Sequence, residues 1–141
     1  MICCMTPNDC VFCKIIAGRI PSSKVYEDDS IIAFLDIAPV NPGHTLIVPK
    51  VHYPDFLSTP PKLATQMLAV LWRIVPAVLK VTKAPAFNVG INNGRAAGQL
   101  VDHVHFHLMP RHKGDGLKSW KNGSYAPGEA FRLAQQIAVL V

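Results

Sequence analysis

The spacing of apolar residues divides the chain into segments with strand periodicity and segments with helix periodicity. Short apolar runs between turn residues predict five strands, at residues 24–27, 31–36, 44–49, 86–92 and 103–110. Hairpin-length links separate several of these runs, which favours antiparallel pairing. The pattern therefore predicts one antiparallel sheet.

A longer segment has the spacing of an amphipathic helix. Within residues 62–81, apolar side chains recur every three or four positions, at Leu63, Met67, Val70, Leu71, Ile74, Val78 and Val81. Pro76 lies inside this segment and is expected to kink the helix or shift its register, because proline lacks a backbone N–H. Short helices are predicted at 9–18, between an Asp9 cap and a Gly18 stop, and at 128–141. The fold class is therefore α+β: a five-stranded antiparallel sheet with a long helix and short terminal helices.

Composition suits a single domain with its own core. The chain has 141 residues, and 50% of them are hydrophobic. Prolines interrupt the apolar stretches, so no membrane-spanning run is expected, and the first residues lack the pattern of a signal peptide. The net charge of +5 favours an anionic ligand, but no Lys/Arg run marks a nucleic-acid surface. These features predict a cytoplasmic protein with no nucleic-acid or membrane partner.

Three histidines at alternate positions, His103, His105 and His107, are the most specific chemical feature of the chain. Side chains of a strand alternate between two faces, so the three imidazoles should share one face of the predicted strand. A solvent-facing polar row or a metal-binding patch would give the same pattern. Imidazole titrates near neutral pH and often serves in catalysis, which favours a catalytic row.

Two cysteines, Cys10 and Cys13, have the C-x2-C spacing of a tetrahedral zinc site. Two buried cysteines or a redox pair would show the same spacing. A closed zinc site needs two further ligands. Antiparallel pairing of the strands at 44–49 and 103–110 would bring His52 close to His103, and would place His44 near the other two histidines of the row.

Several motifs occur together and in a fixed order. They are GHTLIVPK at residues 43–50, Ala97-Gly98-Gln99, and HVHFHL at residues 103–108. With the segments 25–29 and 33–37, these motifs resemble the histidine triad (HIT) family of nucleotide hydrolases and transferases. The resemblance extends over residues 10–111. It implies the HIT-like fold, in which two five-stranded sheets join across a two-fold homodimer.

The resemblance implies roles for the histidines. His105 would attack the α-phosphorus of a nucleoside phosphate derivative and form a nucleotidyl-imidazole intermediate, which water then hydrolyses. The other ring nitrogen of His105 should donate to a backbone carbonyl that fixes the tautomer. His107 and His44 would bracket the phosphate oxygens, and Gln99 would bond to the phosphate region.

The resemblance also implies a nucleoside site and a metal site. Asp36 would accept hydrogen bonds from the ribose hydroxyls, Asn92 would contact the sugar or phosphate, and Gly98 would let the backbone approach the ligand. An apolar slot would hold a purine base, and its walls would be Phe12, Ile15, Phe34 and Ile37. Ordinary core packing explains Phe12, Ile15 and Phe34 almost equally well. HIT proteins with a C-x2-C pair hold a structural zinc, which implies the ligands Cys10, Cys13, His52 and His103.

One residue departs from the family pattern. After Gly-Gln many members carry Ser or Thr, whose hydroxyl can reach the phosphate or the leaving group, whereas Leu100 offers no hydrogen bond. The leading interpretation is a hydrolase of purine nucleoside phosphoramidates and related AMP conjugates, as in the Hint branch. The alternatives are hydrolysis of dinucleoside polyphosphates such as diadenosine tetraphosphate, and a nucleotide-binding scaffold with little activity.

The expected organisation has three parts: a disordered or variable N-terminus at 1–8, a HIT catalytic domain at 9–112, and a variable C-terminal loop and helix at 113–141. The apolar residues of the C-terminal helix are expected to pack on the domain or on a second subunit. The apolar stripe of the long helix, widened by Trp72 and Val75, is broader than one small sheet would bury. A homodimer contact through this helix and the strand at 86–92 would cover it.

Overall fold

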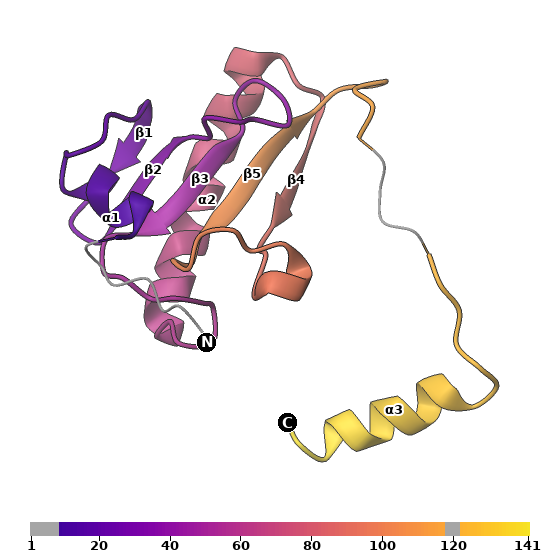
Figure 1. Cartoon of the computed structure of the whole chain (residues 1–141). Coiled ribbons are helices and arrows are strands. Elements are labelled where there is room, and N and C mark those ends of the chain that lie inside the picture. Colours follow the sequence, from indigo (N-terminus) through magenta and orange to yellow (C-terminus); the bar gives the residue numbers. More distant parts are fainter. Residues whose placement is uncertain (1–8, 118–121) are drawn as a thin grey trace.

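A five-stranded antiparallel sheet forms the centre of the molecule, as predicted. The computed structural model describes residues 9–117 and 122–141, so the predicted N-terminal segment 1–8 lies outside the described residues. The sheet order is β1-β2-β3-β5-β4, and each neighbouring pair is antiparallel (Figure 1). The strands are β1 Lys24–Glu27, β2 Ile31–Leu35, β3 Thr45–Pro49, β4 Ala86–Gly90 and β5 Phe106–Arg111.

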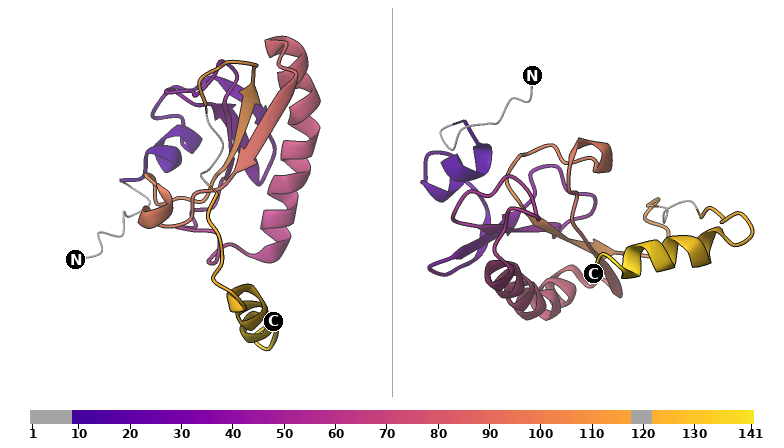
Figure 2. Two further views of the ribbon diagram at one scale, coloured as in Figure 1. Left: turned by 90° about the vertical axis from the view of Figure 1, so that its right-hand side faces the viewer. Right: turned by 90° about the horizontal axis from the view of Figure 1, so that it is seen from below.

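Helices cover both faces of the sheet (Figure 2, left). The long helix α2, Pro61–Thr82, packs on one face, and α1, Val11–Ile16, lies on the other. The α2 side has a core cluster that combines one apolar stripe of the helix with strand residues, among them Ile47, Phe106 and Leu108. The α1 side has a second cluster that contains Cys10, Phe12 and Phe34. The functional residues lie on this second side.

One expectation about α2 is wrong: prolines do not interrupt its apolar run. The kink or register shift at Pro76 stays a prediction. The helix continues through Pro76 without a break, and Pro61 stands in its first turn, where the missing N–H costs no helical hydrogen bond. Prolines therefore do not shorten this apolar run as expected, and α2 is by length and composition alone apolar enough to cross a membrane. The core helix of a globular protein passes the same test, and α2 buries five side chains against the sheet: Met67, Val70, Leu71, Ile74 and Val78.

The histidine strand begins later than predicted. Strand β5 starts at Phe106, not at His103, because the backbone before it bonds elsewhere: the Val104 N–H donates to the Tyr53 carbonyl. The alternation of faces nevertheless persists through this extended segment. Phe106 packs in the cluster under α2, whereas the rings of His103 and His105 contact Phe12 on the α1 side.

The terminal helices differ from the prediction in their ends and their packing. The N-cap of α1 is Cys10 and not Asp9, because Cys10 turns its sulfur inward to the site described below. Gly18 follows the helix with φ +72°, as a helix stop requires. The last helix, α3 Glu129–Ala138, buries none of its side chains against the described part of the chain, and it stands away from the sheet in Figure 1. The expected packing on the domain is therefore not observed, and packing on a second subunit stays a prediction.

Candidate functional site

Four side chains from distant segments form a cluster with the geometry of a metal site. Cys10 and Cys13 come from the start of α1, His52 follows β3, and His103 precedes β5. The His103 Nδ1 atom lies 3.5 Å from Cys10 Sγ and 3.6 Å from Cys13 Sγ, and His52 Nδ1 lies 3.4 Å from Cys13 Sγ. Tetrahedral zinc with ordinary Zn–S and Zn–N bonds separates sulfur from nitrogen by about 3.6 Å. The donor set and its spacing therefore fit zinc.

The protonation of these ligands also suits a metal. His103 Nε2 donates to the Pro49 carbonyl at 2.8 Å, which leaves the Nδ1 lone pair facing the two sulfurs. Burial lowers the pKa of His103 to about 4, so this ring is neutral near pH 7. Burial, with the neighbouring Cys10, raises the pKa of the Cys13 thiol to about 11 in the metal-free chain. A bound dication would oppose this shift, because it stabilises the thiolate.

The His105 ring is fixed in one tautomer. Its Nδ1–H donates to the backbone carbonyl of His103 at 2.7 Å, which is the bond expected for a nucleophilic imidazole. The Nε2 atom is then left without a proton. Burial lowers the pKa of His105, so the neutral ring predominates at neutral pH. His105 thus presents an unprotonated nitrogen.

His44 and His107 form a hydrogen-bonded pair beside His105. His44 Nε2 and His107 Nδ1 are 2.9 Å apart, and the Val40 N–H donates to His44 Nδ1 at 3.3 Å. His44 therefore carries its proton on Nε2 and donates it to His107, which leaves His107 with a proton on its own Nε2. That buried Nε2 atom has no hydrogen-bond partner among the described residues. Burial, with the two neighbouring histidines, lowers the pKa of His107 to about 4.

A cavity of about 800 Å³ opens in front of these rings. Its walls include His105, His107 and all seven residues predicted to contact the nucleoside: Phe12, Ile15, Phe34, Asp36, Ile37, Asn92 and Gly98. Apart from Leu100, described below, the rest of the lining has no chemical signature in the sequence: Val11, Ile20, Pro21, Ser22, Ser23, Leu35, Pro39, Leu46 and Val101. Nothing in the sequence distinguishes these from ordinary turn and core residues. The cavity is large enough for a mononucleotide.

The cavity walls divide into a packed part and an open part. The rings of Phe12 and Phe34 meet edge to face, with their centroids 5.6 Å apart, and both residues belong to the core cluster on the α1 side. The same two side chains therefore pack the core and line the cavity. Ile37 is fully exposed and available to a ligand. Asp36 accepts the Ala38 N–H on Oδ1, and its Oδ2 lies 3.7 Å from His44 Nδ1. One carboxylate oxygen of Asp36 therefore faces the histidine pair.

Gln99 lies behind the cavity and holds its loop together. Its Oε1 accepts the Gly94 N–H at 2.7 Å, and its Nε2 donates to the carbonyls of Pro54 and Val101. The described residues that line the cavity do not include Gln99, which is buried. The predicted bond from Gln99 to phosphate stays a prediction, and it would require one of these contacts to break.

Leu100 lies at the opening of the same cavity. Its side chain is 80% exposed and lines the space next to Gly98 and Val101. The neighbouring Arg95 donates to the carbonyls of Gln99 and Leu100 and pairs with Asp102 at 2.8 Å, which fixes the loop. An apolar side chain is thus held at the cavity opening.

A polar cluster supports the loop before His44 from behind. Asp115 accepts hydrogen bonds from Arg111 Nε at 2.8 Å and from Asn41 Nδ2 at 2.9 Å. Asn41 also donates to the Pro110 carbonyl, and its own carbonyl accepts the His44 N–H. The segment 110–115 therefore fixes the backbone that carries His44, although the two segments are far apart in sequence.

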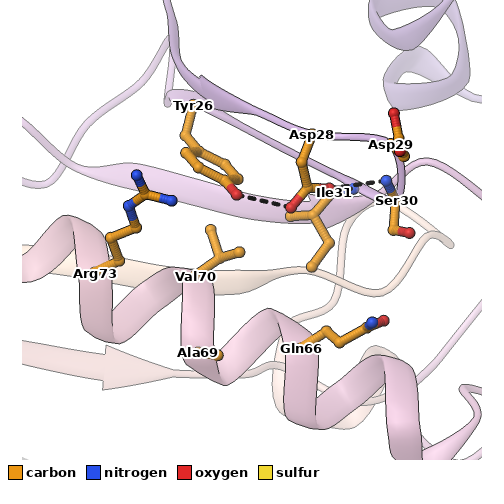
Figure 3. A pocket seen from close by; sticks show the side chains of 9 residues that line it. All are labelled: Tyr26, Asp28, Asp29, Ser30, Ile31, Gln66, Ala69, Val70 and Arg73. Atoms are coloured by element: carbon orange, nitrogen blue, oxygen red, sulfur yellow. Dashed lines mark hydrogen bonds between the residues drawn. The ribbon is translucent and has the colours of Figure 1, made fainter.

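A second, shallower hollow lies away from the histidines, between the β1–β2 turn and α2 (Figure 3). Tyr26 Oη donates to Asp28 at 2.7 Å, and the Arg73 guanidinium lies 5.5 Å from the centre of the Tyr26 ring. Asp28 also accepts the backbone N–H groups of Ser30 and Ile31. These polar groups bond to one another, so we interpret the hollow as structural.

The sequence as a whole matches known proteins. The family model of the HIT domain matches residues 17–114. An adenylylsulfatase of Arabidopsis thaliana, HINT3, is 47% identical over 110 residues, which are 78% of this chain and 56% of that protein. The chain thus spans little more than half of that relative. The adenosine 5′-monophosphoramidase hnt1 of Schizosaccharomyces pombe is 42% identical over 134 residues, which are 92% of this chain and 96% of that protein.

Solved structures agree with the sequence matches. A HIT family protein from Bacillus anthracis superposes with a TM-score of 0.87 at 41% identity, covering 96% of this chain and 99% of that chain. A zinc-bound histidine triad protein from Mycobacterium smegmatis superposes with a TM-score of 0.76 at 37% identity, covering 95% of this chain and 99% of that chain. The matched segment, the sheet order and the histidine row all point the same way, and the chain belongs to the HIT domain family.

Proposed function

We propose that this protein hydrolyses nucleoside 5′-phosphate derivatives, preferably purine nucleoside phosphoramidates, through a covalent intermediate on His105. The observation that carries the proposal is the fixed tautomer of His105 at the wall of a nucleotide-sized cavity. The names of two relatives, an adenylylsulfatase and an adenosine 5′-monophosphoramidase, both refer to an adenosine phosphate carrying a further group. HIT relatives of the hydrolase type support the broader reading of a nucleotide hydrolase.

The geometry suits a two-step displacement at phosphorus. The base enters the slot beside Phe12 and Phe34, and Asp36 accepts the ribose hydroxyls. His105 Nε2 then attacks the α-phosphorus, so that a P–N bond forms while the bond to the leaving group breaks. The Nε2–H of His107, which lacks a partner among the described residues, is free to donate to a phosphate oxygen. Water then cleaves the P–N bond and releases the nucleoside monophosphate.

The cysteine and histidine cluster would hold a structural zinc in this scheme. Four protein ligands leave no open coordination position, so the metal would fasten α1 to the sheet and would not contact substrate. Its ligand His103 also provides the carbonyl that orients His105. The metal would thus hold His103 in place, and His103 in turn orients the nucleophile His105.

Two other functions remain as alternatives. Dinucleoside polyphosphates share the nucleotide half of the substrate and carry a bulkier leaving group, and the exposed apolar side chain of Leu100 favours a bulkier group at that position. A nucleotide-binding scaffold would need the cavity but not the histidine geometry. The intact tautomer arrangement of His105, His44 and His107 favours an enzyme.

A turnover panel decides among these functions. We expect adenosine phosphoramidate to be hydrolysed with a kcat/KM at least about tenfold above that of diadenosine tetraphosphate, which corresponds to about 1.4 kcal/mol of transition-state stabilisation. Aminoacyl adenylates complete the panel, and release of AMP is measured by chromatography. The matched variant Leu100→Ser restores a hydroxyl and should change the ranking of leaving groups without changing AMP affinity. Binding of AMP without turnover of any substrate would favour the scaffold.

We further propose that the protein is a homodimer. Strand β4 is an edge strand of the sheet, and its Phe87 and Val89 are partly exposed, while Trp72 on α2 is 82% exposed. Pairing of two subunits through these surfaces would bury the exposed apolar side chains and would give hydrogen-bond partners to the backbone N–H and C=O groups at the edge of β4. Sedimentation equilibrium should therefore report twice the chain mass of 15.4 kDa.

Matched variants locate the dimer contact. Trp72→Glu should shift the equilibrium toward monomer, because it places a charge in the apolar contact. Val25→Glu, on the opposite edge strand β1, should leave the dimer intact. A wild-type monomer with full activity at low micromolar concentration would contradict the proposal.

A further inference from the structure

One amide side chain, that of Asn41, anchors the loop between β2 and β3 to the end of β5. Asn41 Nδ2 donates to the Pro110 carbonyl and to Asp115 Oδ2, both at 2.9 Å. The backbone carbonyl of Asn41 accepts the His44 N–H at 3.1 Å. The side chain of Asn41 thus fixes the loop, while its main chain holds His44. The described residues that line the cavity include neither Asn41 nor Asp115, so both act on the site from outside it.

The Asp115 carboxylate is a rigid partner for this amide. Arg111 donates to both of its oxygens, from Nε to Oδ2 at 2.8 Å and from Nη2 to Oδ1 at 3.1 Å. The backbone N–H groups of His112 and Leu117 donate to the same carboxylate. The hydrogen bonds from Arg111 hold the pKa of Asp115 well below its usual range, so the group is charged at neutral pH. The side chain is only 7% exposed, and Asn41 therefore binds a charged acceptor in a fixed position.

The Nδ1 atom of His44 lies between two groups that favour different tautomers. The Val40 N–H lies 3.3 Å from this nitrogen, and a donor at this place requires a nitrogen without a proton. Asp36 Oδ2 lies 3.7 Å from the same nitrogen, beyond hydrogen-bond distance, and a carboxylate there favours a proton on it. Val40 directly precedes Asn41, so the anchor sets how closely its N–H approaches the ring. The position of the loop therefore decides which tautomer His44 adopts.

The tautomer of His44 in turn determines that of His107. When His44 Nδ1 accepts the Val40 N–H, its Nε2–H donates to His107 Nδ1 at 2.9 Å, and His107 carries its proton on Nε2. When His44 donates from Nδ1 to Asp36, the bond between the rings reverses, and His107 is left with a bare Nε2 atom. This buried atom, which has no partner among the described residues, is the one that donates to a phosphate oxygen in the proposed reaction.

We propose that Asn41 and Asp115 are positioning residues that hold His44 and His107 in the tautomers with a proton on each Nε2 atom. The tautomers are a property of the free protein and can be measured without a substrate. The contribution of the two residues to turnover rests on the proposed hydrolase function.

NMR spectroscopy of the imidazole nitrogens tests the tautomers directly, because long-range correlations to the ring protons show which nitrogen is protonated. In the wild type we expect a proton on Nε2 of both His44 and His107. Asn41→Ala removes the anchor but keeps the pair of Arg111 and Asp115, and it should move both protons to Nδ1. Asp115→Asn removes the charged acceptor and should act in the same direction. If Asp115→Asn fails to fold, Asn41→Ala alone carries the test.

Asp28→Asn is the matched control. It makes the same chemical change at a carboxylate that also accepts several hydrogen bonds, from Tyr26 Oη and from the N–H groups of Ser30 and Ile31. This carboxylate belongs to the hollow between the β1–β2 turn and α2. Its loss should leave both histidine tautomers and the turnover as in the wild type.

Turnover is measured separately, as the single-turnover rate at saturating adenosine phosphoramidate. We expect a fall of at least about tenfold in Asn41→Ala, because loss of one donor to a transition-state oxygen costs about 10²–10³-fold and the alternative tautomer would form only in part. AMP should still bind to the variant, since the apolar slot is unchanged. The expected effect is therefore on kcat.

Three results would overturn the proposed positioning role: unchanged tautomers in both anchor variants even if turnover fell, a wild type with its protons on Nδ1, or a shift of the tautomers in Asp28→Asn. Shifted tautomers with wild-type turnover would overturn the contribution to catalysis. A chain whose tautomers respond as expected but which hydrolyses no nucleotide would overturn the proposed function, and would leave the control of the tautomers standing.

Discussion

Replacement of His105 by alanine is expected to reduce turnover by at least about 10³-fold, in the range found when a covalent catalytic group is lost. The physical reason is that the Nε2 atom of this ring is an unprotonated nitrogen at the cavity wall, with its tautomer fixed by the bond from Nδ1–H to the His103 carbonyl. Single-turnover release of AMP from adenosine phosphoramidate measures the effect.

The same variant should still bind AMP. Asp36 and the aromatic slot are untouched by the substitution, so calorimetry should give an affinity close to that of the wild type. His112→Ala, which makes the same chemical change at a histidine outside the cavity lining, serves as the control and should turn over normally. Turnover near the wild-type rate in His105→Ala would exclude this residue as the nucleophile.

Loss of the proposed zinc should have the largest effect on stability. The double variant Cys10→Ser, Cys13→Ser removes both thiolates, so purified protein should contain no ion at this site, compared with about one per chain in the wild type. The buried His103 would then face a gap where the ion stood. A loss of several kcal/mol corresponds to a fall in Tm of more than about 10 °C for a chain of this size.

Calorimetry and metal analysis check this prediction together. Cys3→Ser with Cys4→Ser removes two thiols from the segment outside the described residues and should change neither quantity. Metal-free wild-type protein with an unchanged Tm would mean that the C-x2-C pair serves packing or redox chemistry. Zinc loss should also reduce turnover, because the same residue, His103, contacts the cysteines and orients His105.

Much of this architecture could be predicted from the sequence because it depends on periodicity and on antiparallel pairing. Antiparallel pairing of β3 with β5 places His44 at the same end as His107 and the segments that carry His52 and His103 at the other end, so the division of the histidines into two groups could be predicted. The conformation of the loops did not follow in this way. The start of β5 depends on a bond from Val104 to the Tyr53 carbonyl, which no local pattern indicates.

Tertiary contacts also decided the details that local rules missed. Asp9 is a better helix cap than cysteine by intrinsic preference, yet the cap falls on Cys10, which turns toward the histidine ligand. Gln99 has the hydrogen-bonding capacity to contact a phosphate, but three backbone groups in its own loop and in the segment after β3 use it instead. The amphipathic pattern of α3 correctly predicts a helix but cannot specify what covers its apolar face.

The Asp115 cluster sets a limit on how far the chain can be shortened by protein engineering. A truncation after residue 112 would keep every ligand and every histidine of the row, yet it would remove the carboxylate that holds Asn41 and Arg111 together. Arg111 also donates to the Leu117 carbonyl, so this support extends to that residue. We therefore expect the smallest stable fragment to end no earlier than Leu117, so a fusion partner or an affinity tag should replace no residue up to Leu117, the partner of Arg111.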